Sequence, residues 1–143
     1  MANEVKIEDH TDELLKDLAT KEEKALVMVG MQAEGDAKIE IESSPRRVDT
    51  GRLRNSITWA IKSRHSEPQY IGGDNADEVD PDSGVREDQV PDDRSVIIGT
   101  NVEYACEIHE GRKGLDPNRF LRNAIEHNYE TYRKMIDDVL KQD

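Results

Sequence analysis

An acidic segment at residues 65–93 limits the fold of this chain more than any other feature. It holds ten Asp and Glu residues against one Arg, and so carries nine of the twelve net negative charges of the 143-residue chain. Three prolines and three glycines are spread through it. A segment this polar, with this many Pro and Gly residues, has neither the apolar content nor the regular backbone of a core element. We therefore expect a long loop here, and a core built from the residues on either side.

Two segments have the apolar spacing of long helices. From about residue 9 to 42, apolar side chains recur every three or four residues, and Pro45 follows the pattern and stops it. Near the C-terminus, Asp116 is a favourable N-cap and Pro117 a favourable first helical residue. The apolar positions after them keep helical steps of three and four residues: Leu121, Ile125, Tyr129, Tyr132, Ile136 and Val139. We expect Leu121 and Ile125 to face a sheet.

The segments between the two helices have the alternation of strands. Ile57, Trp59 and Ile61 alternate with less apolar residues, which predicts a strand with one apolar face. Residues 95–99 (SVIIG) form a β-branched run that predicts a second strand. Because neighbouring strands in a sequence usually pair, we expect an antiparallel pair joined by the acidic segment.

Residues 101–110 fit either a short helix or a strand. We favour a helix capped by Asn101, because Glu103 and Glu107 would then share one exposed face. The expected architecture is a single α+β domain over residues 1–143. It has a long N-terminal helix, a small antiparallel sheet with a long acidic loop between its strands, and a long C-terminal helix packed on the sheet.

Residues that could carry catalysis are not spaced for it. The four histidines (His10, His65, His109 and His127) have no metal-ligand spacing from one another or from Cys106, so we expect exposed histidines and a small buried cysteine. The acidic segment does not match a calcium-binding loop, because aligning its Gly84 with the loop glycine puts valine and proline at ligand positions. We expect no enzyme activity, no metal and no cofactor.

The charge and hydropathy of the chain argue against two classes of partner. A net charge of −12 is unsuited to binding DNA phosphates or an anionic membrane. No apolar run is long enough to span a bilayer and the N-terminus has no signal-peptide core, so we expect a soluble protein made in a cytoplasm. The cationic residues cluster at Arg46, Arg47, Arg52 and Arg54. They form either a solvated turn paired with nearby acids or a patch that faces an acidic partner.

Four segments, in order along the chain, resemble a known set of motifs. Residues 48–57 (VDTGRLRNSI), with Pro45 before them, resemble P-x-D-T-G-x-L-R-x-S-I. Residues 98–105 (IGTNVEYA) are similar to v-G-t-x-v-x-Y-A, residues 108–111 (IHEG) to v-E-x-G, and residues 117–125 (PNRFLRNAI) to P-x-R-P-F-L-R-P-A-l. These motifs are those of the gene-product-ten-like tail-component family of lambda-like long-tailed phages and prophages.

The resemblance implies a structural virion protein without catalytic residues. Members of the family act as neck, head–tail connector, tail-completion or tail-terminator proteins. It implies a homo-oligomeric ring of six or twelve copies, beside head-completion, portal-adaptor and tail-tube proteins, with DNA passing through the channel without specific binding. The implied location is the neck or tail of the virion, after assembly in the host cytoplasm. The motif positions carried over are Asp49, Thr50, Gly51, Leu53, Ser56, Gly99, Tyr104, Ala105, Glu110, Gly111, Phe120, Leu121 and Ala124.

Within this reading, the acidic segment would project from the sheet into the channel or toward a neighbouring ring. Its acids would keep passing DNA from binding at close approach. We expect its removal over residues 67–92 to leave the melting temperature unchanged, because no core would be lost. The alternative function is an acidic protein-binding module, or a nucleic-acid mimic that inhibits a DNA-acting enzyme. The acids that we single out are Asp74, Asp77, Glu78, Asp80, Asp82, Glu87 and Asp88.

Overall fold

The computed structural model describes residues 11–43, 51–69 and 80–142, with side chains in the first helix from residue 20 onward. Asp49, Thr50, Asp74, Asp77 and Glu78 lie outside the described residues. The elements, in chain order, are four α-helices, two strands and two 3-10 turns: α1 (Thr11–Ile41), α2 (Arg52–Ser56), β1 (Thr58–Ala60), η1 (Pro81–Ser83), η2 (Glu87–Gln89), β2 (Ile97–Gly99), α3 (Ala105–Glu110) and α4 (Phe120–Leu140).

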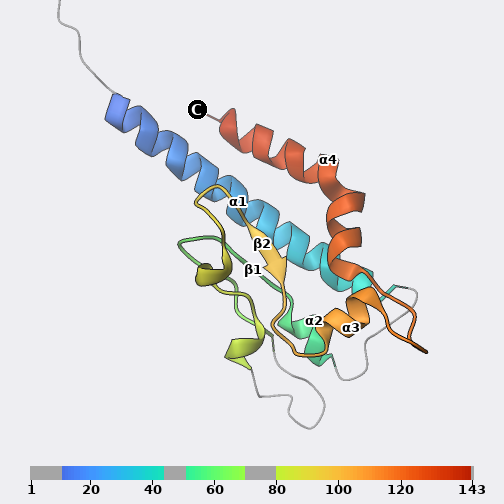
Figure 1. The fold of residues 1–143 in the computed structure, drawn as a ribbon. Coiled ribbons are helices and arrows are strands. Elements are labelled where there is room, and N and C mark those ends of the chain that lie inside the picture. Colours follow the sequence, from blue (N-terminus) through green and yellow to red (C-terminus); the bar gives the residue numbers. More distant parts are fainter. Residues whose placement is uncertain (1–10, 44–50, 70–79, 143) are drawn as a thin grey trace, which may run out of the picture.

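The fold is α+β, as the sequence predicts. The two long helices lie side by side and run in opposite directions, and the strands lie in front of α1 (Figure 1). The two strands are antiparallel, with Thr58 opposite Gly99 and Ala60 opposite Ile97. The acidic segment joins the two strands, as expected from their order in the sequence.

The core runs along one side of α1, where small side chains allow close packing. Ala33 and Ala37 are almost fully buried, and Gly30 lies so close to Trp59 that a Cβ at this position would stand 2.8 Å from the indole Cγ. One end of the core joins α1 to α2, α3 and the start of α4, and the other joins α1 to the middle of α4. Despite its two internal glycines, the helix is continuous over 31 residues.

Both faces of β1 are buried, which differs from the one-faced strand predicted. On one face, Trp59 packs against α1. On the other face, Ala60 packs with Val85 and Val90, which are 5% and 1% exposed. Both valines belong to the acidic segment, so the expectation that this segment contributes nothing to the core is wrong. The segment covers the second face of the sheet because it brings two valines to a strand that would otherwise be half exposed.

The starts of α3 and α4 also differ from expectation. Asn101 does not cap α3, because its amide donates to the Gly84 carbonyl at 2.8 Å and pairs with the Gln89 amide. A short helix does form, but it begins at Ala105.

The last helix begins at Phe120 rather than at Asp116–Pro117. Asn118 holds the chain in a connecting conformation before the helix, because its backbone N–H donates to the Ile108 carbonyl at 2.9 Å. Its buried amide donates to the Ile41 carbonyl at the end of α1 at 3.2 Å.

Candidate functional site

Most of the motif residues converge in the core, and Ala105, Glu110, Phe120 and Leu121 also line a small surface pocket of about 250 Å³. Leu53, Ala105, Phe120 and Ala124 are buried in one cluster with the end of α1, and Leu121 packs against its edge. These five residues come from α2, α3 and α4. Residues so placed determine how the helices pack, and none of them offers a chemical group to a ligand.

Two smaller motif residues fix the approach of the strands. Ser56 is 1% exposed, donates to the Leu53 carbonyl at 2.6 Å and shares a hydrogen bond with the Thr100 hydroxyl at 2.6 Å. At Gly99, a Cβ would stand 3.2 Å from Cγ1 of Val85 in the acidic segment. A side chain at residue 99 would therefore press against the segment that covers the sheet.

Two motif glycines lie at turns, and one motif acid lies on the surface. Gly51 precedes α2 with φ of 83°, and Gly111 ends α3 with φ of 79°, a region that favours glycine. Glu110 is exposed and binds His109 at 2.8 Å, and this hydrogen bond lowers the pKa of the Glu110 carboxyl. The His109 ring in turn meets the ring of Phe120 edge-on, with 5.3 Å between centroids.

The described part of the arginine cluster is paired with acids. Arg52 binds Glu103 at 3.0 Å, lies 3.7 Å from Asp80, and has its guanidinium carbon 5.6 Å from the centroid of the Tyr104 ring. The hydrogen bond from Arg52 lowers the pKa of the Glu103 carboxyl. Arg54 binds Glu42. Arg46 and Arg47 lie outside the described residues, so the described arginines match the solvated, acid-paired interpretation.

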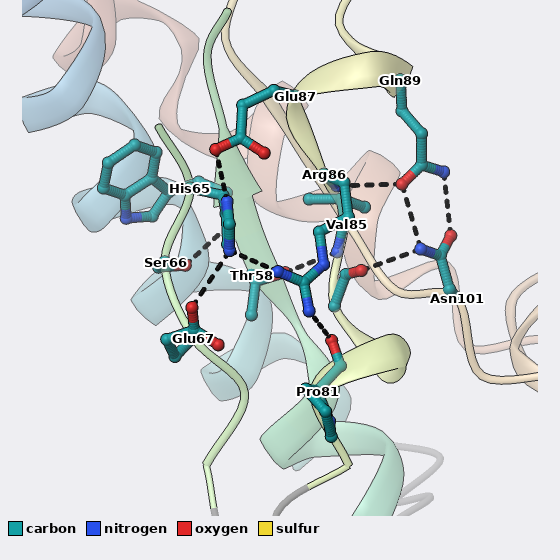
Figure 2. A network of polar contacts seen from close by, with 12 residues as sticks. Thr58, His65, Ser66, Glu67, Pro81, Val85, Arg86, Glu87, Gln89 and Asn101 are labelled. Atoms are coloured by element: carbon teal, nitrogen blue, oxygen red, sulfur yellow. Dashed lines mark hydrogen bonds and ion pairs between the residues drawn. The ribbon is translucent and has the colours of Figure 1, made fainter. Parts of the chain in front are cut away.

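A polar network joins the first residues of the acidic segment to its later part (Figure 2). The His65 Nδ1 lies 2.6 Å from Glu87, and its Nε2 lies 3.0 Å from Glu67 and 2.5 Å from the Arg86 guanidinium. The hydrogen bond with His65 lowers the pKa of Glu87. Beside this network, the Val85 N–H donates to the Thr58 hydroxyl at 2.8 Å.

Several single-residue expectations are wrong. The side chains of His65 and His109 are only 17% and 16% exposed, because both rings pack against the body and bind acids. Cys106 is exposed, because it lies on the outer side of α3. Ile125 is 44% exposed rather than packed on the sheet, because it borders an open groove. His127 is exposed, as expected, and lies 2.9 Å from Glu40.

The described residues include no group of three His, Cys, Asp or Glu side chains placed to hold a metal ion. Over the same residues, no helix has the length and apolar content needed to cross a membrane.

Two apolar surfaces stand out on this fold, and we name the first the apolar ridge. It consists of Met28, Met31, Gly35 and Ile39, four residues on the outer side of α1. Met31 is 62% exposed and Ile39 is 65% exposed. Gly35 sits between them, and a Cβ there would meet no atom within 4 Å. The helix thus buries its alanines together with Val29 and Ile41 on its inner side, and it exposes Met28, Met31 and Ile39 on its outer side.

The second surface is an apolar groove of about 470 Å³ between β2 and α4, with α1 as its floor. Tyr129, at its border, is 58% exposed. The groove is lined by Val29, Ala33, Val96, Ile97, Ile98, Ile125, Tyr129, Tyr132, Arg133, Ile136 and Asp137.

Neither surface was predicted from the sequence. The spacing of Met28, Met31 and Ile39 could have revealed the ridge, because these residues fall on the side of the helix opposite to the alanines. The groove depends on the distance between β2 and α4. This distance is set by tertiary packing, and it cannot be inferred from the local sequence pattern of either element.

Comparison of this chain with models of protein families, with characterised proteins and with solved structures found no match in any of the three.

Proposed function

We propose that this chain is a structural protein of a tailed phage or prophage virion, and that it forms a homo-oligomeric ring in the neck, at the head–tail junction. In this role it is not an enzyme and needs no cofactor. Six or twelve copies surround a channel, between head-completion or portal-adaptor proteins on one side and tail-tube proteins on the other. The protein assembles in the host cytoplasm and remains in the virion.

The observation that carries this proposal is that α1 is apolar on two opposite sides. Its inner side is covered by α4 and the sheet, whereas Met28, Met31 and Ile39 on its outer side are exposed. A surface helix of a single domain needs one apolar stripe, which faces the core, so a second stripe is left over. Clustered exposed apolar side chains of this kind mark a protein–protein contact. In a ring, this second side of α1 would be buried against a neighbouring copy.

The positions of the motif residues also support the proposal. Leu53, Ala105, Phe120 and Ala124 lie in one cluster although they come from three of the four resembling segments. Motifs of a structural family are expected to specify packing in this way, whereas those of an enzyme family would bring polar groups together at a cleft.

The exposed acids suit a channel through which DNA slides. Asp82, Asp88, Asp92 and Asp93 are exposed on the folded part of the acidic segment. Carboxylates held there repel phosphates within about 10 Å at 0.1 M salt. DNA would therefore pass the ring without specific binding.

The exposed acids also favour a second candidate function, an acidic module that binds a protein or mimics nucleic acid. Carboxylates on a packed segment keep fixed spacings, which a mimic of phosphates requires. Under this alternative, the purified chain would bind a DNA-acting enzyme in competition with DNA. Replacing Asp82 and Asp88 by Asn would weaken that binding.

Deletion of the coding sequence from the phage or prophage genome that carries it tests the proposal. We expect DNA-filled heads and finished tails that do not join, and recovery of joined virions when the chain is supplied from a plasmid. A Cys106→Ser chain should restore joining fully, because this exposed side chain has no part in the core. Normal infectious virions from the deletion would contradict the proposal.

A further inference from the structure

We propose that copies of this chain associate head to tail, with the apolar ridge of one copy seated in the apolar groove of the next. This inference rests on the proposed function, because it takes the partner in the ring to be a second copy.

The ridge and the groove face in opposite directions. Val29 and Ala33 form the floor of the groove, whereas Met31 belongs to the ridge. Met31 is two residues from each of them, which is about 200° around a helix of 3.6 residues per turn. The same separation relates Gly35 to Ala33. The groove therefore opens on one side of α1 and the ridge projects from the other.

This opposition determines the symmetry of any contact between them. A two-fold dimer brings the same patch of both copies together, so it could join ridge to ridge or groove to groove. A contact between ridge and groove leaves one free groove and one free ridge on the resulting pair. Such an interface continues from copy to copy, and it closes into a ring when the rotation between copies divides a full turn.

The shapes and chemistry of the two surfaces complement each other. The ridge is convex, because it lies along the outside of a helix, and its methionines adapt to irregular surfaces. Gly35 leaves a notch between Met31 and Ile39, where no other atom of the described residues would lie within 4 Å of a Cβ. The groove is concave, and Ile125 and Tyr129 stand at its border.

The areas are also of the right size. The exposed fractions of Met31, Ile39, Ile125 and Tyr129 lie between 44% and 65%. With roughly 150–250 Å² for a large side chain, the exposed side chains of the ridge offer about 200–300 Å² of apolar area. That is enough for the apolar centre of an interface of about 800 Å² per partner, in which a polar rim makes up the rest. One chain thus carries both halves of the contact.

Disulfide trapping tests the proposal directly. In a Cys106→Ser background, which removes the natural exposed thiol, we introduce Met31→Cys on the ridge and Ile125→Cys on the groove. Under mild oxidation we expect the double variant to give a ladder of linked species beyond the dimer. Each single variant should remain unlinked, because the ridge of one copy does not meet the ridge of another.

A mixing experiment provides a second test. Met31→Asp disables the ridge and Ile125→Asp disables the groove, and each variant alone should be monomeric by light scattering. An equimolar mixture should give dimers and nothing larger, because one working ridge meets one working groove. Thr131→Asp is the matched control, because Thr131 is exposed on α4 about 200° from Tyr129. It should assemble like the parent chain, and all variants should share its circular-dichroism spectrum.

The outcomes separate this inference from the proposed function. Linked dimers from Met31→Cys alone, or unlinked double variants of a chain that still forms oligomers, would overturn the ridge-to-groove contact and leave the ring standing. A parent chain that stays monomeric at millimolar concentration, with no linked species from the double variant, would overturn both.

Discussion

Two glycines in α1 allow a controlled test of the packing between this helix and the sheet. Gly30 and Gly35 are interior residues of the same helix, and alanine at either position should favour the helix by about 1 kcal/mol. At Gly35 a Cβ would meet no atom within 4 Å. We therefore expect Gly35→Ala to raise the free energy of unfolding by about 0.5–1 kcal/mol.

At Gly30 the same substitution meets a rigid obstacle. The added Cβ would stand 2.8 Å from Cγ and 3.0 Å from Cβ of Trp59. Trp59 is 7% exposed and its backbone is paired with β2, so the indole cannot move away without shifting the sheet. Overpacking of this kind costs about 1–3 kcal/mol. The helix-propensity gain is common to both variants, so their difference reports the clash alone.

Urea unfolding followed by circular dichroism measures both variants. We expect Gly30→Ala to be less stable than Gly35→Ala by about 1–3 kcal/mol, with equal denaturant slopes, at micromolar concentrations of monomer. Equal stabilities would show that Trp59 does not pack on α1 as described. A destabilised Gly35→Ala would show that the outer side of α1 is not free in the monomer.

Three further predictions concern the core and the polar contacts. Val90→Ala should lower the free energy of unfolding by about 2 kcal/mol in the same urea assay, because this side chain is 1% exposed, whereas a solvated tether would give no change. Tyr132→Phe removes the hydroxyl that donates to Asp36 at 2.6 Å and should cost about 1–2 kcal/mol at pH 7. Burial raises the pKa of Tyr132, so the phenol ionises first in the unfolded chain and the parent chain should lose stability as pH rises above 10. A series of thermal melts at increasing pH should show a smaller loss in the variant. Glu87→Gln should lower the melting temperature at pH 7, because the hydrogen bond with His65 lowers the pKa of Glu87 and stabilises its ionised form. The difference in melting temperature between the parent chain and the variant should disappear as pH falls below 4.5. A difference that persists at pH 3 would contradict this.

Local patterns in the sequence were sufficient to predict the fold class. The helical spacing before Pro45 and after residue 120, and the β-branched run at residues 95–99, are strong because each repeats over several turns or positions. The strand pairing followed from the order of the elements. A short helix was favoured over a strand for residues 101–110, and a helix forms at residues 105–110, but Asn101 does not cap it.

What failed depends on contacts between distant parts of the chain. Val85 and Val90 are surrounded by acids in the sequence, which suggests that they are solvated. In the structure they pack against Ala60 on the second face of the sheet, and the Val85 N–H donates to the Thr58 hydroxyl. The two buried valines, together with hydrogen bonds to Thr58 and from Asn101, hold the segment against the sheet. In the same way, Asn118 is used to bind the end of α1, which delays the start of the last helix.

The candidate surfaces were harder to predict than the fold. The motif residues identified from the sequence turn out to be largely core residues, because a structural motif records how helices pack. The ridge could have been found from the helical positions of Met31 and Ile39. Only the structure shows that the ridge is a second apolar side of α1, because the opposite side is already buried against the rest of the domain.

Cryo-electron microscopy of the neck in virions produced from the genome that encodes this chain tests the central claim most directly. We predict a closed ring of identical copies at the head–tail junction, six or twelve in number, into which the α+β domain fits with α1 between neighbouring copies. A neck map in which no layer accommodates this fold, or a single copy outside any ring, would contradict the account.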